Sequence, residues 1–281
     1  MTTRSKAVLV TGCSSGIGHA TALELVDRGW KVYATARKPE TLTELAEKGA
    51  RVLALDVTDE DSMRAAVDTV TEAEGAVGVL VNNAGYSQSG AIETVPMADV
   101  RRQFETNVFG LVRMCQLVLP GMRNQGWGKI VNLSSMGGRL TFPGGGLYHA
   151  TKYAVEAISD ALRFEVRGFG VDVIIIEPGL IVTNFGGVAA GSVQPTEDVG
   201  YAEFNRGVAK LTEEAYQGPM AKLGAGPEAV AKTIAKAVAS KRPKARYPVT
   251  PSAHIMINQR RLMADRVWDL VMRSQFPTPG R

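Results

Sequence analysis

The chain opens with a short apolar strand, a glycine-rich turn and a helix in direct succession. Residues 6–11 (KAVLVT) are apolar and β-branched, as in a buried parallel strand. The turn over residues 12–18 (GCSSGIG) carries three glycines, and apolar side chains then recur at helical spacing over residues 19–28. Glycines let a backbone approach a pyrophosphate closely, and a helix N-terminus offers it free N–H groups. A glycine cluster alone is a weak signal, but in this setting it predicts a dinucleotide site.

The chain then alternates strands with helices. Further strands are predicted over residues 31–36, 52–55, 77–81, 129–133 and 171–177, with an edge strand over 246–249, and helices over residues 41–48, 59–74, 99–123 and 148–167. This alternation predicts an α/β fold: a Rossmann-like, doubly wound parallel sheet of about seven strands with helices on both faces, forming one domain over residues 1–281. In such sheets, ligands bind at the carboxyl ends of the strands.

Tyr148 and Lys152 lie four residues apart, and Ser135 precedes Tyr148 by thirteen positions. If Tyr148 opens a helix, its side chain shares one face with that of Lys152, with Cβ atoms about 5–6 Å apart. An ammonium about 4 Å from a phenol favours the phenolate by about 4 kcal/mol at an effective dielectric of about 20. That attraction would lower the pKa of the tyrosine by up to about three units, so that it could exchange a proton at a reacting oxygen. Alone, the pair is more typical of an ordinary surface helix, so the other motifs decide its meaning.

Arg37 and Lys38 follow the second predicted strand, where no Asp or Glu is present. In dinucleotide-binding folds an acidic side chain near this point binds the adenosine ribose hydroxyls, whereas an arginine accommodates a 2′-phosphate. The planar guanidinium of Arg37 suits bidentate phosphate contact. The pattern therefore favours NADP(H), with NAD(H) as the second choice. The alternative is two solvated charges at a strand end.

Composition bounds the remaining classes of function. The net charge of +4 is mild, and no basic and aromatic alternation suggests nucleic acid. No run of about eighteen apolar residues suggests a transmembrane helix, and residues 1–6 show no signal-peptide pattern, so a cytoplasmic protein is expected. Cys13 and Cys115 are expected to be packing thiols. His19, His149 and His254 lack metal-ligand spacing, so no metal site is predicted.

The ordered set of motifs resembles the short-chain dehydrogenase/reductase family, in its compact single-domain branch. The matching pieces are Thr11-Gly-x-x-x-Gly-x-Gly18, Asp56, Asn82-Asn-Ala-Gly85, Asn107, Ser135, Tyr148-x-x-x-Lys152 and Pro178-Gly179 with Thr183. They lie within residues 6–185, about two thirds of the chain. Each piece is a weak signal alone, but all of them in this order on predicted strand ends form a strong one.

The resemblance implies four catalytic residues. Tyr148 would be the general acid/base at the substrate oxygen, and Ser135 would hydrogen-bond that oxygen. Ser134 competes for the serine role, but the spacing to Tyr148 favours Ser135. Lys152 would hold the nicotinamide ribose and lower the pKa of Tyr148. Asn107 would anchor a water in a proton relay behind Lys152.

The resemblance also implies the cofactor contacts. They are Gly12, Ser14, Ser15, Gly16, Ile17, Gly18, Arg37, Asp56, Val57, Asn83, Ala84, Gly85, Tyr148, Lys152, Pro178, Gly179, Ile181 and Thr183. The three glycines of the first turn would approach the pyrophosphate. Asp56 and Val57 would lie at the adenine, and Ile181 and Thr183 at the carboxamide. Ala36 stands where relatives that prefer NAD carry an acidic residue, which again points to NADP(H).

Beyond residue 185 no chemical motif is present. Residues 186–226, rich in glycine and with a predicted helix over 201–217, would form a mobile lid over the substrate. Residues 227–281 would add a helix over 227–240, the edge strand and a tail over 251–276. The tail combines apolar residues with four arginines. Packing on its own domain or on a partner subunit is favoured over contact with a membrane surface.

These features together predict an NADP(H)-dependent oxidoreductase that interconverts a carbonyl and an alcohol. The tail and the second strand loosely resemble the steroid, retinoid and lipophilic-alcohol branch of the family, which suggests a lipophilic small-molecule substrate. A non-catalytic NADP(H)-sensing regulator, and an epimerase or dehydratase on the same fold, are the alternatives. Relatives of this kind are usually homodimers or homotetramers, and the helices over 99–123 and 148–167 are the expected subunit contacts.

Overall fold

The fold is built on one seven-stranded parallel sheet with strand order β3-β2-β1-β4-β5-β6-β7. The computed structural model describes residues 4–194, 196 and 199–280. The strands are β1 (Ala7–Val10), β2 (Lys31–Ala36), β3 (Arg51–Ala54), β4 (Val79–Asn82), β5 (Gly128–Leu133), β6 (Val171–Pro178) and β7 (Arg246–Val249). The order reverses between β1 and β4, which is where ligands bind in doubly wound sheets. The predicted fold class, including the edge strand, is confirmed.

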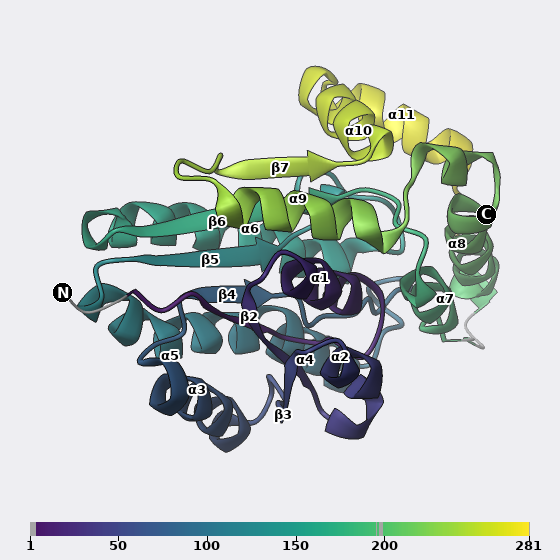
Figure 1. The fold of residues 1–281 in the computed structure, drawn as a ribbon. Coiled ribbons are helices and arrows are strands. Elements are labelled where there is room, and N and C mark those ends of the chain that lie inside the picture. The colour runs from purple at the N-terminus through teal and green to yellow at the C-terminus, as the bar shows by residue number, and fades with distance from the viewer. Residues whose placement is uncertain (1–3, 195, 197–198, 281) are drawn as a thin grey trace.

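Helices cover both faces of the sheet, so its inner strands are buried on both sides, whereas the edge strands β3 and β7 are only partly buried. Val8 and Val10 of β1 pack into one hydrophobic cluster, whereas Ala7 and Leu9 pack into the other. The first face carries α1 (Gly16–Asp27), η1 (Pro39–Leu42), α2 (Thr43–Glu47) and α9 (Pro227–Ala239). The second carries α3 (Glu60–Glu74), α5 (Gly110–Asn124) and α6 (Gly146–Val166). Figure 1 shows α1 and α9 side by side on their face.

The helix predicted over residues 99–123 is interrupted, which corrects that prediction. The chain forms α4 (Met97–Phe104), then a five-residue π-helical turn, η2 (Glu105–Phe109), and only then α5. The turn contains Asn107, which is buried. Directly after it, Gly110 packs on the backbone of Val57, where a Cβ would lie 2.3 Å from the carbonyl oxygen. π-Helical turns occur frequently at functional sites, and this one places the Asn107 amide beside α6.

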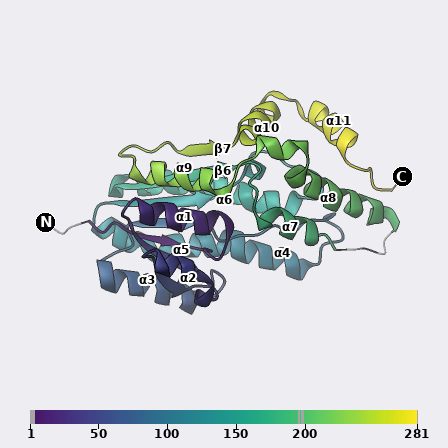
Figure 2. The same ribbon diagram turned by 45° about the vertical axis from the view of Figure 1, so that its right-hand side comes forward.

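The C-terminal helices lie beyond the carboxyl ends of the strands (Figures 1 and 2). They are α7 (Asn184–Gly191), α8 (Val199–Gln217), α10 (Pro251–Leu262) and α11 (Asp265–Gln275); short 3-10 turns lie at η3 (Met136–Gly138), η4 (Arg167–Phe169) and η5 (Pro219–Leu223). The predicted tail is therefore two helices. Trp268 of α11 packs with Leu140 and donates from Nε1 to the Thr141 carbonyl at 3.2 Å. This contact anchors α11 on its own chain, whereas Leu262, Val267 and Leu270 of the tail are exposed. What covers the rest of the tail stays a prediction.

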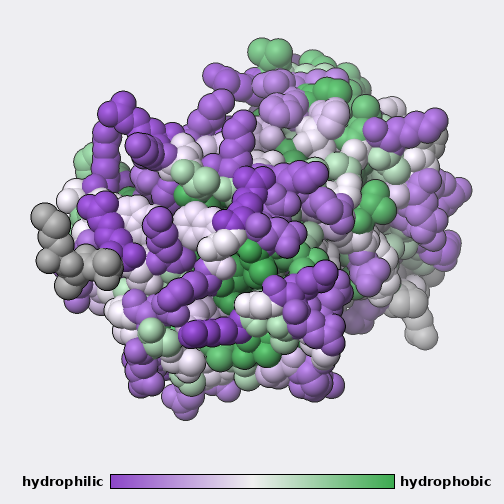
Figure 3. Space-filling view, viewed as in Figure 1, coloured by the Kyte–Doolittle hydropathy of each residue, from purple (hydrophilic) through white to green (hydrophobic). Residues whose placement is uncertain are grey.

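The surface of the protein is mixed in character. The face in Figure 3 is largely hydrophilic, with hydrophobic side chains in small patches between the charged ones. Cys13 and Cys115 are buried free thiols, and burial raises the pKa of each to about 12. Within the described part of the chain, no helix is long and apolar enough to cross a membrane. The same residues contain no cluster of three or more His, Cys, Asp or Glu side chains suited to a metal.

Candidate active site

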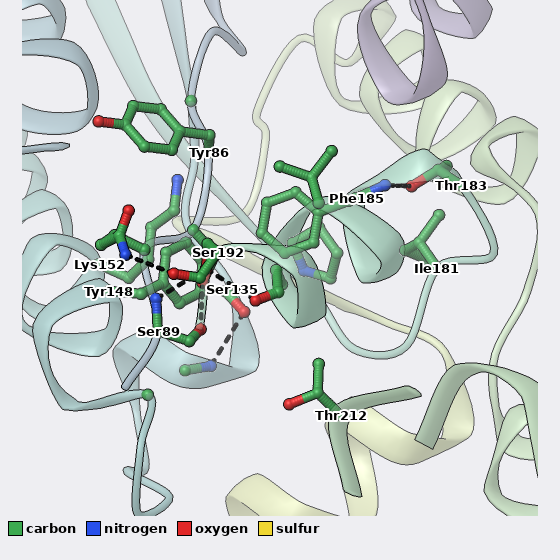
Figure 4. A pocket seen from close by; sticks show the side chains of 18 of the residues that line it. Tyr86, Ser89, Ser135, Tyr148, Lys152, Ile181, Thr183, Phe185, Ser192 and Thr212 are labelled. Carbon is green, nitrogen blue, oxygen red and sulfur yellow. Dashed lines mark hydrogen bonds between the residues drawn. The ribbon is translucent and has the colours of Figure 1, made fainter. Parts of the chain in front are cut away.

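A cavity of about 1210 Å³ lies at the carboxyl edge of the sheet. Seventeen of the residues predicted for cofactor binding line it together with Ser135. They are Ser14, Ser15, Ile17, Arg37, Asp56, Val57, Asn83, Ala84, Tyr148, Lys152, Pro178, Ile181 and Thr183, with the backbone of Gly12, Gly16, Gly85 and Gly179. Figure 4 shows Ser135, Tyr148 and Lys152 together on one side of this cavity, and Phe185, Ile181 and Thr183 on the other. Gly18 and Asn107 are the two predicted site residues that do not line it.

Gly18 packs the first helix against the glycine-rich turn. A Cβ at this position would lie 2.2 Å from the Gly12 carbonyl oxygen and 2.4 Å from Nδ2 of Asn83. That Asn83 amide itself donates to the carbonyls of Thr11 and Gly12, at 2.9 and 3.0 Å. Gly18 does not line the cavity, and its approach to the pyrophosphate stays a prediction. Its missing side chain allows close packing between helix and turn.

The remaining residues of the turn form a cradle that fits a dinucleotide. Gly12 and Gly16 have positive φ values, 74° and 59°, which favour glycine. Ser15 is the N-cap of α1 but makes no side-chain capping bond, so the first N–H groups of the helix face the cavity without that partner. Thr11, which the predicted contacts omitted, accepts the backbone N–H groups of Asn83 and Ala84 at 3.0 Å each. The cradle thus combines free donors, small residues and a fixed backbone.

At the end of β2 the cavity is lined by the cationic side chain of Arg37, and β2 carries no carboxylate there. Ala36 is buried and Arg37 is exposed at the cavity wall. Asp56, after β3, accepts the Thr58 backbone N–H at 2.9 Å and the Thr58 hydroxyl at 2.7 Å with one carboxylate oxygen. Asp56 is thus already hydrogen-bonded within the chain, whereas the Arg37 side chain is available to a ligand at the end of β2.

Ser135, Tyr148 and Lys152 come from two adjacent segments, the turn after β5 and the start of α6. Ser135 caps η3, and its Oγ accepts the Gly137 N–H at 3.0 Å. Lys152 is buried and donates from Nζ to the Leu133 carbonyl at 2.8 Å, 5.7 Å from the centre of the Tyr148 ring. Tyr148 and Lys152 thus share one helix face, as their spacing predicted. Ser134 also lines the cavity, but Ser135 is the serine whose hydroxyl contacts Tyr148.

In the predicted catalytic trio of Ser135, Tyr148 and Lys152, burial is the largest influence on the pKa values of the two titratable side chains. It raises the pKa of Tyr148; Tyr216 raises it further, whereas the hydrogen bond with Ser135 lowers it. Burial also lowers the pKa of Lys152 to about 8, and the Glu156 carboxylate opposes that change. The expected depression of the Tyr148 pKa by Lys152 is therefore not found. The Lys152 ammonium is committed to a backbone carbonyl, and both groups lose solvation.

Asn107 lies behind the trio rather than in the cavity wall. Its Oδ1 accepts the Tyr86 N–H at 3.1 Å, and its Nδ2 donates to the Tyr86 carbonyl at 2.8 Å and to the Thr151 hydroxyl at 3.1 Å. The Thr151 hydroxyl in turn donates to the Tyr148 carbonyl at 2.7 Å. The amide therefore joins the segment after β4 to the helix that carries Tyr148. Thr151 was not identified from the sequence, because a threonine inside a helix has no distinguishing pattern.

The wall opposite the strand ends is mostly apolar and comes from segments without sequence motifs. It includes Phe185, Val188, Val208, Leu211, Tyr216, Met256 and Phe276. These side chains lie on or next to α7, α8, α10 and α11. The Phe185 ring lies 5.6 Å from the Tyr148 ring, centre to centre. A reacting group beside Tyr148 would therefore be enclosed by apolar side chains.

Comparison with known proteins identifies the family. The sequence model of the short chain dehydrogenase family matches residues 6–190. This chain belongs to the short-chain dehydrogenase family. The enzyme is 37% identical over 269 residues to the uncharacterized oxidoreductase YbbO of Escherichia coli, covering 95% of this chain and 94% of that one. The predicted family and the predicted class, a short-chain oxidoreductase, are confirmed.

Two further relatives have named substrates. The enzyme is 38% identical over 250 residues to a 3-ketodihydrosphingosine reductase of Bacteroides thetaiotaomicron, covering 89% of each chain. It is 37% identical over 272 residues to an NADPH-dependent 3-dehydrocapnine reductase of Ornithobacterium rhinotracheale, covering 94% of each chain.

Solved structures agree with the fold. A short-chain dehydrogenase from Streptomyces avermitilis superposes with a TM-score of 0.77 at 35% identity, covering 96% of this chain and 98% of that one. A serine dehydrogenase in complex with NADP⁺ superposes with a TM-score of 0.76 at 29% identity, covering 87% and 94%.

Proposed function

We propose that this enzyme is an NADP(H)-dependent oxidoreductase that interconverts a carbonyl and an alcohol on a lipophilic small molecule. The observation that carries the proposal is the meeting of Ser135, Tyr148 and Lys152 at a cavity with a dinucleotide cradle at one end and an apolar wall at the other. When bound, the nicotinamide supplies the hydride chemistry. The chain supplies the position and the proton.

Tyr148 is the proton donor in reduction. Because burial raises its pKa, Tyr148 keeps its proton at neutral pH and can give it to the substrate oxygen as negative charge develops there. The Ser135 hydroxyl donates a hydrogen bond to the same oxygen and stabilises that charge. Lys152 would hold the nicotinamide ribose with its ammonium. Asn107 fixes the segment after β4 against α6, and a water bound near it would complete a proton relay.

The cofactor contacts follow the cradle. Gly12, Ser14, Ser15, Gly16 and Ile17 would surround the pyrophosphate. Asp56, Val57, Asn83, Ala84 and Gly85 would lie along the adenosine half, and Pro178, Gly179, Ile181 and Thr183 at the carboxamide, since all of these line one continuous cavity.

The preference for NADP(H) rests on Arg37. The end of β2 offers a guanidinium and no carboxylate. One relative is named as NADPH-dependent and one structural neighbour contains NADP⁺, whereas another neighbour, at 26% identity, contains NAD. NADP(H) is therefore the proposed cofactor and NAD(H) the weaker one.

Replacing Arg37 with Ala should weaken NADPH binding about 10- to 100-fold and leave NADH binding within about twofold. The reason is that a hydrogen bond to a charged group contributes about 1.5–3 kcal/mol, and only NADPH carries the 2′-phosphate. Both dissociation constants can be measured from the fluorescence of the reduced nicotinamide. The matched control is Lys38→Ala, because Lys38 is the neighbouring cation and does not line the cavity. Equal weakening of NADPH by both variants would contradict a specific role for Arg37.

A lipophilic ketone is the proposed substrate class. The wall from α7, α8, α10 and the end of α11 is mostly apolar, and two relatives are named for reduction of 3-ketodihydrosphingosine and 3-dehydrocapnine. The test is NADPH oxidation by the purified enzyme with a series of 2-alkanones of increasing chain length. Turnover that improves with chain length is expected. NADPH that stays bound without net oxidation would instead favour an epimerase, a dehydratase or a sensor of the cofactor.

Self-association remains a prediction that the surface supports. Phe109 of η2 and Phe164 of α6 are 55% and 85% exposed. These aromatic side chains lie on the two helical segments predicted to contact a partner subunit. Large exposed aromatic residues are enriched at protein interfaces, so a homodimer or homotetramer is proposed. The cytoplasmic location stays a prediction.

A further inference from the structure

Tyr216 of α8 brings a second phenol into the active-site cavity. Its side chain lines the same cavity as Tyr148. Its ring lies directly on the backbone of Gly186 in α7, where a Cβ would be 2.6 Å from Cγ and 2.7 Å from Cδ2 of the ring. The glycine therefore provides the space that the ring occupies. Because the contact involves the base of the ring, it fixes the direction of the whole side chain.

The hydroxyl of Tyr216 has no protein partner to account for its position. Among residues 4–194, 196 and 199–280, no hydrogen bond is made by this hydroxyl. Burial raises its pKa to about 12, so the group is a neutral phenol at working pH. Tyr216 is half-buried, and its hydroxyl is open to the cavity, where a ligand atom can form a hydrogen bond with it.

The reacting oxygen of the substrate does not need this hydroxyl. Ser135 and Tyr148 already face that oxygen from the strand side of the cavity, whereas Tyr216 approaches from α8 on the apolar side. Tyr216 is nevertheless close enough to Tyr148 to influence its titration. The two phenols thus line the same cavity from different elements, so a substrate bound at Tyr148 can present a second polar atom to Tyr216.

We propose that Tyr216 makes a hydrogen bond with a second polar group of the substrate, carried by the carbon next to the reacting carbonyl. The preferred substrates are then ketones with an apolar chain and a hydroxyl or similar group beside the carbonyl. This inference rests on the proposed function, because it assumes that Tyr148 and Ser135 bind a carbonyl. Sites built to bond a substrate hydroxyl discriminate strongly against analogues without it.

The test compares a long-chain 1-hydroxy-2-alkanone with the 2-alkanone of equal length. Tyr216→Phe removes only the hydroxyl. It should raise KM for the hydroxyketone about tenfold, as expected for one lost hydrogen bond of about 1.4 kcal/mol, with kcat within about twofold. KM and kcat for the plain ketone should stay within about twofold. Tyr153→Phe, at an exposed tyrosine of α6, is the matched control.

A pair of adjacent glycines gives an independent test. Gly186→Ala should displace the Tyr216 ring and reproduce the tenfold rise in KM for the hydroxyketone. Gly187→Ala should change neither ketone, since a Cβ at Gly187 meets nothing within 4 Å. Both glycines lie in α7, so the gain in helix propensity is the same for the two variants.

The outcomes separate this inference from the proposed function. Equal losses on both ketones in Tyr216→Phe would show that the tyrosine only shapes the cavity, and a loss of kcat on both would make it a second proton donor; either result overturns the inference and leaves the proposed function in place. If the wild-type enzyme binds NADPH but reduces neither ketone, the proposed function fails and the inference fails with it.

Discussion

Tyr148→Phe should lower kcat for ketone reduction by about 10³-fold, within the range of about 10²- to 10⁴-fold for general acid catalysis. The change removes one hydroxyl and with it the proton that burial holds on Tyr148 at neutral pH. The ring contact with Phe185, at 5.6 Å, is unaffected by the change. NADPH binding should therefore stay within about twofold. Single-turnover NADPH oxidation and a fluorescence titration measure the two quantities.

The control for this experiment is Tyr153→Phe, five residues further along the same helix. Tyr153 is exposed and does not line the cavity, so its variant should match the wild type. Turnover of Tyr148→Phe within about threefold of the wild type would mean that another group provides the proton. A large loss of NADPH affinity would mean instead that Tyr148 acts mainly in holding the cofactor.

The sheet and the position of the site were predictable because their signals are local. The parallel strands are segments of four to eight residues in which apolar side chains predominate, and the residues with chemical function lie within two residues of the strand ends. Asn83 follows β4, Ser135 follows β5, and Gly179 follows β6. Since the carboxyl ends of parallel strands meet at one edge, order along the chain was enough to place these residues together.

The π-helical turn at Asn107 could not be predicted from periodicity. Apolar residues continue at helical spacing on both sides of residues 105–109, so the sequence reads as one helix. The extra residue of the turn rotates the side chains of α4 about the helix axis relative to those of α5. No residue type in the sequence marks this rotation. The turn leads into Gly110, whose close packing on the Val57 backbone is a contact distant in sequence that periodicity cannot show.

The pKa values of Tyr148 and Lys152 also could not be predicted from the sequence. Spacing placed Tyr148 and Lys152 on one helix face, but it could not show that both are desolvated or that Leu133 takes the ammonium. Residues of the apolar wall, Tyr216 among them, were missed for a related reason. An amphipathic pattern predicts that one face of a helix is buried, but it does not show whether that face packs against the hydrophobic core or lines a ligand cavity.

Raising the pH should show whether Lys152 acts through its charge. Burial disfavours the ammonium, so the pKa of Lys152 falls from 10.5 to about 8, and the charged form is present below that value and lost above it. The kcat/KM for reduction should therefore be constant below about pH 7 and fall about tenfold per unit above about pH 8, because this parameter reports groups of the free enzyme. Initial rates of NADPH oxidation at low ketone concentration, from pH 6 to 9.5, measure it.

Lys152→Met should lower kcat/KM about 10²- to 10³-fold at pH 7 and abolish the fall above pH 8, leaving a low and flat profile. Other titratable groups at the cavity do not explain a limb at this pH. Burial raises the pKa values of Tyr148 and Tyr216 well above it, and lowers that of His149 to about 4. Lys38→Met, at an exposed lysine, should keep both the rate and the limb. If Lys152→Met lost activity but kept a limb near pH 8, the titrating group would be a different one, and Lys152 would act by shape and by its bond to Leu133 rather than by its charge.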